Sequence, residues 1–297
     1  SRGISGNRVS SGLNVISVNG VAVSMQLPNN AATNGWYNVL SDPASAKQVS
    51  GTVRAPYVVL GAGVTGLSAA RQLATHLPDE EIVLIEAERV GFGTSGRNSG
   101  FALDSFFHGD EPLNNPELSR AHARLCTGGL NILRKLVKEY EIECGWHDWG
   151  KLHVSAGAEG DASLKGFIKG YETLGIQAQE LNADEVAAVT GSTFYTAGLK
   201  VEATGLMNPA AMCRGLGETL PANVTLYENT PVHRLERGQP SRLITANGEV
   251  IADHLIMCTN VFSPALGFSK SDMVPVVAYA SLTRPMTALE QAEIGGD

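Results

Sequence analysis

The chain has 297 residues, of which 43% are hydrophobic and 18% charged, so it can bury a sizeable core and is not globally disordered. Its 22 Lys and Arg against 30 Asp and Glu give a net charge of -8, which disfavours a nucleic-acid-binding protein. No apolar run approaches the length of a transmembrane helix and the N-terminus lacks the apolar core of a signal peptide, so a cytoplasmic protein is expected. The four cysteines are too widely spaced for a disulfide scaffold or a zinc knuckle, and no metal site is predicted.

Residues 1–50 are rich in Ser, Asn, Gly and Val and are expected to form an N-terminal arm. Between Leu13 and Leu27, apolar and polar residues alternate around Asn19-Gly20, which predicts a hairpin with a two-residue turn. Gly35-Trp36-Tyr37 follows, and nothing in this arm suggests chemistry.

The pattern changes at Tyr57. Tyr57–Leu60 is a continuous apolar run, typical of a strand buried on both faces of a parallel sheet. It leads into Gly61-Ala62-Gly63-Val64-Thr65-Gly66, and residues 67–74 then favour a helix with an apolar face. Residues 81–86 form the next predicted strand, so this region is predicted to be a βαβ unit.

Each glycine of this fingerprint has a physical role in binding a dinucleotide. Gly61 permits the tight turn, Gly63 lets the backbone approach a pyrophosphate, and Gly66 lets the helix pack closely on the strand. The helix N-terminus offers N–H groups and a partial positive charge to the phosphates. Glu86, twenty positions after Gly66, would accept hydrogen bonds from ribose hydroxyls and disfavours NADP. The motif predicts a cofactor that contains ADP, and by itself it does not separate NAD from FAD.

A second glycine-rich loop, Gly91–Gly100, follows the βαβ unit, and helices and strands alternate after it. Periodicity predicts helices over residues 115–140, 164–174, 183–189 and 209–220. Strands are predicted over residues 151–155, 198–202, 224–227, 230–235, 254–258 and 274–286, with a hairpin over 243–251 through Asn247-Gly248.

With the loop from Glu86 to Gly100, the sequence closely resembles the D-amino-acid-oxidase-like (DAO) family of FAD-dependent amine and amino-acid oxidases. Within the family, it most resembles the glycine oxidase and gamma-glutamylputrescine oxidase branches. The resemblance runs from about Trp36 to the last residue and includes Gly205–Ala210, Thr230-Pro231-Val232 and Ala252–Asn260. It implies an α/β fold, α+β overall, in which a Rossmann-like FAD-binding domain is joined to a discontinuous β-sheet substrate domain.

The resemblance implies domains that alternate along the chain. After the arm of residues 1–50, residues 51–145 and 205–268 would form the FAD-binding domain, and residues 146–204 and 269–297 the substrate domain. Members of the family are normally longer than this chain, so the substrate domain is expected to be incomplete at its C-terminus. A second polypeptide that completes the fold is expected, with a cleaved or disordered remainder as the alternative.

The resemblance also implies FAD as the cofactor. No His or Cys occurs between Glu86 and Gly100, so the FAD is expected to be bound non-covalently. The residues that the resemblance places at the cofactor are Gly61, Gly63, Val64, Thr65, Gly66, Glu86, Ala87, Gly93, Thr94, Ser95, Arg97, Asn98, Ser99, Val232, Thr259 and Asn260. A surface salt bridge is the alternative role for Arg97, and plain core packing is the alternative for Val232.

In the family's reaction, a hydride moves from the carbon bearing an amine to flavin N5, and the imine hydrolyses to a carbonyl plus ammonia or an amine. A small amine or amino-acid substrate is implied, and no dedicated side-chain base is required. The candidates for its pocket are Asp104, His108, Tyr279 and Arg284; a structural role beside Pro285 is an equal alternative for Arg284. His147 and Asp148 are adjacent in a strand-like segment, so they are interpreted as packing and surface residues rather than a catalytic pair.

Two other functions stay open. The length of the chain motivates a catalytically silent FAD- or nucleotide-binding subunit of a split oxidoreductase. An NAD-linked dehydrogenase is the other, and the Thr94–Asn98 loop weakens it. The sequence chooses neither the substrate nor the electron acceptor.

Overall fold

The computed structural model describes residues 14–18, 21–25, 34–41, 45–105, 107, 111–269, 272–274, 276, 278 and 280–294. The chain divides into two compact units, each assembled from separated segments. The first unit comprises Ser1–Asn34, Pro43–Glu88 and Asn223–Tyr279, and the second comprises Gly35–Asp42, Arg89–Ala222 and Ala280–Asp297. Residues 89–145 therefore belong to a different unit from the sheet that carries the glycine fingerprint.

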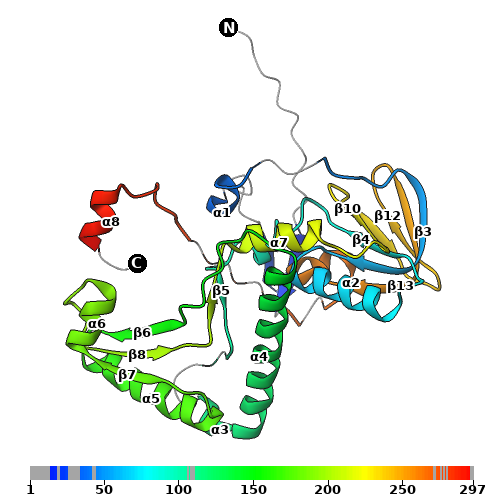
Figure 1. Cartoon of the computed structure of the whole chain (residues 1–297). Helices are drawn as coiled ribbons and strands as arrows, with labels where there is room; N and C mark the ends of the chain where they lie inside the picture. Colours follow the sequence, from blue (N-terminus) through cyan, green and yellow to red (C-terminus); the bar gives the residue numbers. More distant parts are fainter. Residues whose placement is uncertain are drawn as a thin grey trace. The chain divides into compact units, whose positions relative to one another are not determined.

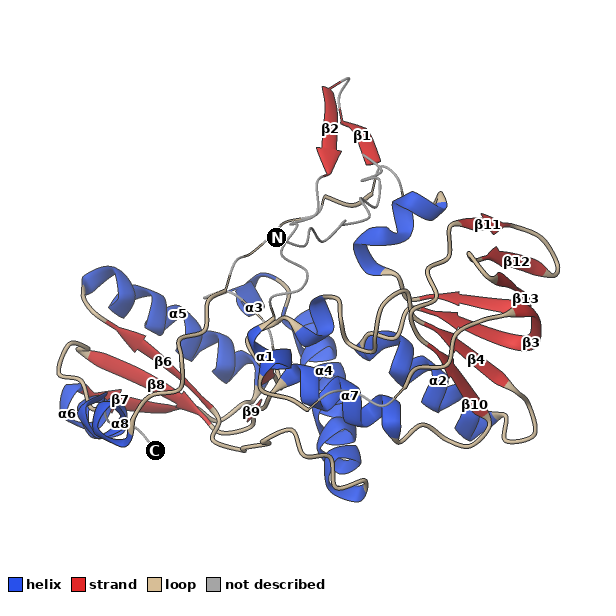
Figure 2. Ribbon diagram, turned by 90° about the horizontal axis from the view of Figure 1, so that it is seen from above, coloured by secondary structure: helices blue, strands red, loops and turns tan. Residues whose placement is uncertain are grey.

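A six-stranded sheet of order β10-β4-β3-β13-β12-β11 is the framework of the first unit (Figure 2). Its strands are β3 (Gly51–Leu60), β4 (Ile82–Ile85), β10 (Val224–Tyr227), β11 (Arg234–Glu236), β12 (Ser241–Ile244) and β13 (Gly248–Met257). The first four strands in the sheet order are parallel, and β12 and β11 extend it in antiparallel fashion. Helix α2 (Val64–His76) connects β3 to β4 and lies beside the sheet (Figure 1), which confirms the predicted βαβ unit.

Burial explains the apolar composition of the central strands. All four residues of β4 are buried, and Val58 and Val59 of β3 have no exposed surface. Leu67 and Ala70 of α2 are fully buried as well. Continuous apolar sequence, rather than alternation, is what a strand covered on both faces requires.

Three strand predictions in the first unit are corrected by the structure. β3 begins at Gly51, six residues before the predicted start. β13 is one strand that joins the second arm of the predicted hairpin to residues 254–258, and its last four residues are half-buried or exposed rather than buried. β11 begins only at Arg234, four residues after the predicted start, and the amide of Thr230 donates its hydrogen bond to the Glu86 carbonyl rather than to a strand.

The N-terminal hairpin is present in the first unit. β1 (Asn14–Val18) pairs antiparallel with β2 (Val21–Met25), as the alternation predicts. The predicted turn at Asn19-Gly20 lies outside the described residues.

An antiparallel sheet and its covering helix form one part of the second unit. The sheet has the order β6-β8-β7, with β6 (Lys151–Ser155), β7 (Gln179–Asn182) and β8 (Ala197–Val201). Helix α5 (Ala158–Leu174) packs along it (Figure 1), and Leu164, Tyr171, Leu199 and Val201 form a shared buried core. α5 begins six residues before the predicted helix. The prediction missed these residues because the first two turns are rich in Ala and Gly and give little apolar signal.

The other elements of the second unit are short, apart from one long helix. They are α1 (Gly35–Asn38), the 3-10 helix η1 (Thr94–Gly96), α3 (Glu111–Asn114), α4 (Pro116–Glu139), α6 (Ala183–Thr190), α7 (Pro209–Glu218), α8 (Ala288–Ile294) and the strand pair β5 (Phe101–Ala102) with β9 (Gly205–Leu206). Three of the predicted helices, α4, α6 and α7, begin directly after an asparagine that caps them. Asn115, Asn182 and Asn208 each accept hydrogen bonds from backbone amides of the first turn of α4, α6 and α7.

The predicted strand over residues 274–286 is wrong for the described residues of that segment, which form no strand. Val274 and Val276 are 80% and 89% exposed, and among its described residues the β-rich segment has no neighbouring strand that would satisfy the backbone. None of the helices in the described part of the chain combines the length and the apolar character that a membrane span needs.

Candidate functional site

The glycine fingerprint forms the tight turn between β3 and α2, at the carboxyl end of a central strand. Gly61 has a φ of +104°, a conformation that favours glycine. A Cβ atom on Gly66 would lie only 1.8 Å from the Gly61 carbonyl oxygen, and one on Gly61 would lie 2.5 Å from the carbonyl oxygen of Cys258, the residue after β13. Glycine is therefore required at both positions, because the neighbouring backbone comes too close to leave room for a side chain.

The beginning of α2 suits an anion. The helix starts after Gly63, whose backbone is extended and which provides no side-chain cap. The first N–H groups of a helix and its positive dipole end attract phosphate when no side chain occupies the position. Val64 and Thr65, the first two residues of α2, are exposed. The turn thus fits the pyrophosphate that the fingerprint predicts.

Glu86 follows β4 and binds this turn directly. Its Oε2 atom accepts a hydrogen bond of 2.8 Å from the amide of Ala62, and its Oε1 atom accepts one of 3.1 Å from the amide of Glu88. Burial raises the pKa of the Glu86 carboxyl above its ordinary value, and the backbone donors oppose that shift. Each carboxylate oxygen has a second lone pair, so the group retains capacity to accept hydrogen bonds from a ribose.

Three other predicted residues lie near or beside this turn in the first unit. Thr259 follows β13, and its amide nitrogen lies 3.6 Å from the Cβ position of Gly61. Asn260 begins the 3-10 helix η2 (Asn260–Leu266) with a φ of +46°. Ala87 is exposed directly after Glu86. Val232 is half-buried and packs against the hydrophobic core of the unit.

The second glycine loop, in the second unit, has the same backbone construction as the fingerprint. Gly91 has a φ of +70°, and a Cβ atom on Gly96 would lie 2.3 Å from the Gly91 carbonyl oxygen. The spacing of five positions is that of Gly61 and Gly66. Gly93 precedes η1, and a Cβ atom there would have no neighbour within 4 Å. The backbone at Gly93 is therefore open to an approaching group.

Polar side chains hold this loop from within. Arg97 donates a hydrogen bond of 2.6 Å from Nε to the Phe92 carbonyl, and its guanidinium lies 4.6 Å from the centre of the Phe92 ring. Asn98 donates to the Ser95 carbonyl at 2.8 Å and accepts from the Gly100 amide at 2.8 Å. Thr94 lies in η1, and Ser99 is exposed between Asn98 and Gly100. The predicted cofactor residues thus form two groups, one in each unit.

Two residues of the arm reach this loop, and sequence reasoning missed them. Trp36 donates a hydrogen bond of 2.9 Å from Nε1 to the Asn98 carbonyl, and the Tyr37 hydroxyl donates one to the Val90 carbonyl. The only local signal is the pair of adjacent aromatic residues, because the contacts span 62 and 53 positions of the sequence.

The substrate-pocket candidates have partners within the chain or lie outside the described residues. Asp104 is 2% exposed; its Oδ1 atom lies 3.6 Å from Nζ of Lys151 and accepts a hydrogen bond from Ser105. Burial lowers the pKa of Lys151, and the Asp104 charge opposes that shift. Arg284 is exposed, paired with Glu290 at 2.6 Å, and donates to the carbonyl of Pro285. His108 and Tyr279 lie outside the described residues.

Asp148 has partners other than its neighbour His147. It accepts hydrogen bonds from Trp146 Nε1 at 3.0 Å and from Arg134 at 2.9 Å, and Arg134 lowers the pKa of this carboxyl. His147 pairs through its backbone with Leu206. His147 and Asp148 are both exposed, so the surface part of the interpretation holds and neither side chain packs into a core.

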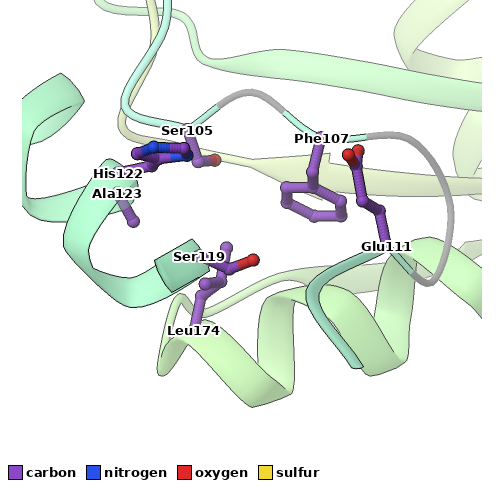
Figure 3. Close-up of a pocket in the computed structure, with 7 residues that line it drawn as sticks. All are labelled: Ser105, Phe107, Glu111, Ser119, His122, Ala123 and Leu174. Carbon is purple, nitrogen blue, oxygen red and sulfur yellow. The ribbon is translucent and has the colours of Figure 1, made fainter. Parts of the chain in front are cut away.

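A small cavity lies in the second unit between α4, α5 and the segment before α3 (Figure 3). Phe107 and Glu111 are on one side of it, and Ser105 and His122 are on the other. Its volume of about 50 Å³ holds a few water molecules, whereas ligand pockets measure roughly 300–1,000 Å³.

Among the residues that the structure describes, no three His, Cys, Asp or Glu side chains gather as a metal site.

Comparisons with known proteins agree with this geometry. Gamma-glutamylputrescine oxidoreductase of Escherichia coli is 29% identical over 209 residues, which cover 69% of this chain and 48% of that protein. Probable oxidoreductase OrdL of Haemophilus influenzae is 27% identical over 240 residues, which cover 77% of this chain and 55% of that protein. The crystal structure of glycine oxidase from Geobacillus kaustophilus shares the fold, with a TM-score of 0.58 and 20% identity over 72% of this chain and 58% of that one.

This chain spans about half the length of the curated relatives that it matches. The second polypeptide expected from the sequence stays a prediction. The family match itself extends over residues 56–296, which include the fingerprint turn, Glu86 and the second glycine loop. The chain belongs to the DAO family of FAD-dependent oxidoreductases.

Proposed function

We propose that this chain carries the FAD site of an oxidoreductase that converts an amine or amino acid to an imine, which hydrolyses to a carbonyl and ammonia or an amine. The observation that carries the proposal is the Gly61–Gly66 turn with the Glu86 carboxylate bonded to the amide of Ala62. In this arrangement the start of α2 would face the pyrophosphate of a dinucleotide, and the carboxylate beside it would face the ribose.

The residues proposed to hold FAD come from both glycine loops and their neighbours. In the first unit they are Gly61, Gly63, Val64, Thr65, Gly66, Glu86, Ala87, Val232, Thr259 and Asn260. In the second unit they are Gly93, Thr94, Ser95, Arg97, Asn98 and Ser99. The proposed binding is non-covalent, since no His or Cys lies between Glu86 and Gly100.

FAD, when bound, supplies the hydride acceptor, flavin N5. The chain's own residues would bind FAD and orient it. Backbone amides at the start of α2 would hold the pyrophosphate, and Glu86 would fix the ribose. Arg97 and Asn98 keep the second loop folded through their bonds to Phe92, Ser95 and Gly100. Asp104 is proposed to hold Lys151, and with it strand β6 of the predicted substrate domain, in place. It is not proposed to act as a catalytic base.

The choice of an amine substrate draws on the relatives. The name of the Escherichia coli relative identifies gamma-glutamylputrescine as its substrate, and the solved relative is a glycine oxidase. Both of these substrates carry an amino group on the carbon chain. A 2-hydroxy acid gives up a hydride in the same manner without releasing nitrogen, so the nature of the product separates the two substrate classes.

The test uses the purified chain loaded with FAD under anaerobic conditions. Amino acids, polyamines, glutamylated polyamines and 2-hydroxy acids are added in turn while the visible flavin absorption is followed. We expect loss of the flavin band with a member of the amine group, together with release of ammonia or an amine and a carbonyl product. Reduction by 2-hydroxy acids alone would contradict the amine proposal. Flavin that stays oxidised with every compound would instead support a catalytically silent FAD-binding subunit.

A further inference from the structure

We propose that the strap, defined as residues 35–41, is a positioning element for the cofactor and that Trp36 and Tyr37 are its positioning residues. The inference rests on the proposed function, because it assumes that the second glycine loop contacts FAD. The strap precedes the part of the chain that matches the family, residues 56–296. Its role is argued from contacts inside the second unit alone.

The strap holds the second glycine loop at both ends. At the start of the loop, the hydroxyl of Tyr37 donates a hydrogen bond to the carbonyl of Val90, which directly precedes Gly91. At the other end, Nε1 of Trp36 donates to the carbonyl of Asn98 at 2.9 Å. Two adjacent side chains thus fix the separation of two backbone carbonyls that enclose η1.

Tyr37 also fills the space under the loop. Its side chain is 9% exposed, and the guanidinium of Arg89 lies 4.9 Å from the centre of its ring. A Cβ atom on Gly91 would lie 3.2 Å from the Tyr37 hydroxyl, and one on Gly96 would lie 3.3 Å from Cε2. The two glycines therefore allow the backbone to close on this ring as well as on itself.

The strap is in turn hydrogen-bonded to α7, so it can restrict the motion of the second glycine loop. Asn208, which caps α7, donates a hydrogen bond of 3.2 Å to the Trp36 carbonyl. Arg214 of α7 donates one of 2.6 Å to the Ser41 carbonyl. Helix α7 (Figure 1) has six buried residues, which makes it a firm support. A loop held by a buried helix through a strap is preorganised before any cofactor arrives.

The experiment compares Tyr37→Phe and Trp36→Phe with Val39→Ala. The first two remove a hydrogen-bond donor while they keep an aromatic ring, and Val39 is 71% exposed in the same segment. Hydrogen–deuterium exchange is measured on residues 90–100 of the FAD-free protein, with β6 and β8 as an internal reference. The Kd for FAD is measured by quenching of flavin fluorescence.

We expect exchange in residues 90–100 to accelerate about fivefold to tenfold in each aromatic variant, which is the effect of one lost hydrogen bond. Exchange in β6 and β8 should not change. The Kd for FAD should rise by a similar factor, and excess FAD should restore the flavin spectrum. Val39→Ala should match the unsubstituted protein in every measurement.

Unchanged exchange in residues 90–100 would overturn the inference, and so would an equal increase in β6 and β8, which indicates a merely structural role. Faster loop exchange with an unaltered Kd would overturn the positioning of FAD while leaving the contacts intact. Failure of the proposed FAD site has a different signature: the unsubstituted protein would bind no FAD at all, whatever the strap variants do to loop exchange.

Discussion

The carboxylate of Glu86 and the amide of Ala62 are joined by a hydrogen bond of 2.8 Å, so the residue after β4 fastens the turn that follows β3. The second oxygen of the same carboxylate accepts from the amide of Glu88. One side chain therefore connects the ends of two parallel strands and fixes the local backbone on both.

Replacement of Glu86 by Gln should weaken FAD binding. An amide has only one acceptor oxygen, so either Ala62 or Glu88 loses its partner, and the charge that favours ribose hydroxyls is removed. Hydrogen bonds to charged groups contribute roughly 1.5–3 kcal/mol, so the Kd for FAD should rise at least about tenfold. Glu88→Gln is the matched control, because the Glu88 side chain is exposed and only the backbone amide of Glu88 donates a hydrogen bond to Glu86. Equal affinities of the two variants for FAD would refute this role.

The pH dependence of stability should carry a signature of Glu86. Burial raises its pKa in the folded protein above the ordinary value of 4.5. The folded state therefore holds the proton more tightly, and the contribution of this group is fully present below pH 4.5 and is lost as the pH rises through the folded pKa. Urea unfolding of the FAD-free protein at several pH values should show this loss in the unsubstituted chain and not in Glu86→Gln. Parallel pH profiles would contradict it.

Two helical glycines should respond to alanine in opposite ways. In Gly66→Ala the new Cβ atom would lie 1.8 Å from the Gly61 carbonyl oxygen, so the β3–α2 turn must shift, and we expect a lower melting temperature and loss of FAD. Gly128 lies in α4, and a Cβ atom there meets nothing within 4 Å. Gly128→Ala should stabilise the protein by about 0.5–1 kcal/mol through helix propensity. Thermal unfolding measures both, and a stable Gly66→Ala that still binds FAD would disprove the close approach.

Gly93→Ala should separate cofactor binding from stability. A Cβ atom at Gly93 has no neighbour within 4 Å, so the FAD-free protein should unfold at an unchanged temperature. If the backbone at Gly93 approaches the cofactor, the added methyl group occupies that space, and the Kd for FAD should rise about tenfold. Gly96→Ala is the contrasting variant, because its Cβ atom would lie 2.3 Å from the Gly91 carbonyl and should lower stability itself. An unaltered Kd in Gly93→Ala would place the cofactor elsewhere.

Lys151→Met should destabilise the second unit. The Asp104 carboxylate is buried, and without Lys151 it keeps an uncompensated charge, which costs about 3–5 kcal/mol. The control is Lys200→Met on the neighbouring strand β8, where the ion pair with Glu202 is exposed and contributes less than about 1 kcal/mol. The double variant Asp104→Asn with Lys151→Met should recover most of the loss, because no buried charge remains. Denaturant unfolding tests all three, and equal effects of the two lysine variants would argue against a buried pair.

The fingerprint turn could be predicted from sequence because its determinants are local. Gly61 and Gly66 belong to the same turn and lie close together in it. The apolar run before them marks a buried strand. The helices capped by Asn115 and Asn208 were predictable for the same reason, since the cap and the first turn it bonds are sequence neighbours. Glu86 was found by its spacing, although its bond to Ala62 was not.

The parts that sequence could not provide depend on distant partners. Residues 274–286 have a β-rich composition, but a strand also needs a neighbour, and the described residues there have none in a ladder. The contacts of Trp36 and Tyr37 connect residues more than fifty positions apart, which no local period reveals. The partner of Asp104 is likewise on another element, β6, and only the fold brings Lys151 to it.

The interleaving of the two units along the chain imposes an order on their assembly during synthesis. The strap of residues 35–41 is made early, and its contacts with the second glycine loop can close once Asn98 has left the ribosome. β3 and β4 are made between these two points, yet their outer neighbours β13 and β10 come much later. Throughout that interval their apolar edges have no native partner, and unpaired strand edges invite aggregation. The nascent chain should therefore depend most on chaperones after β4 is synthesised and before β13 is complete.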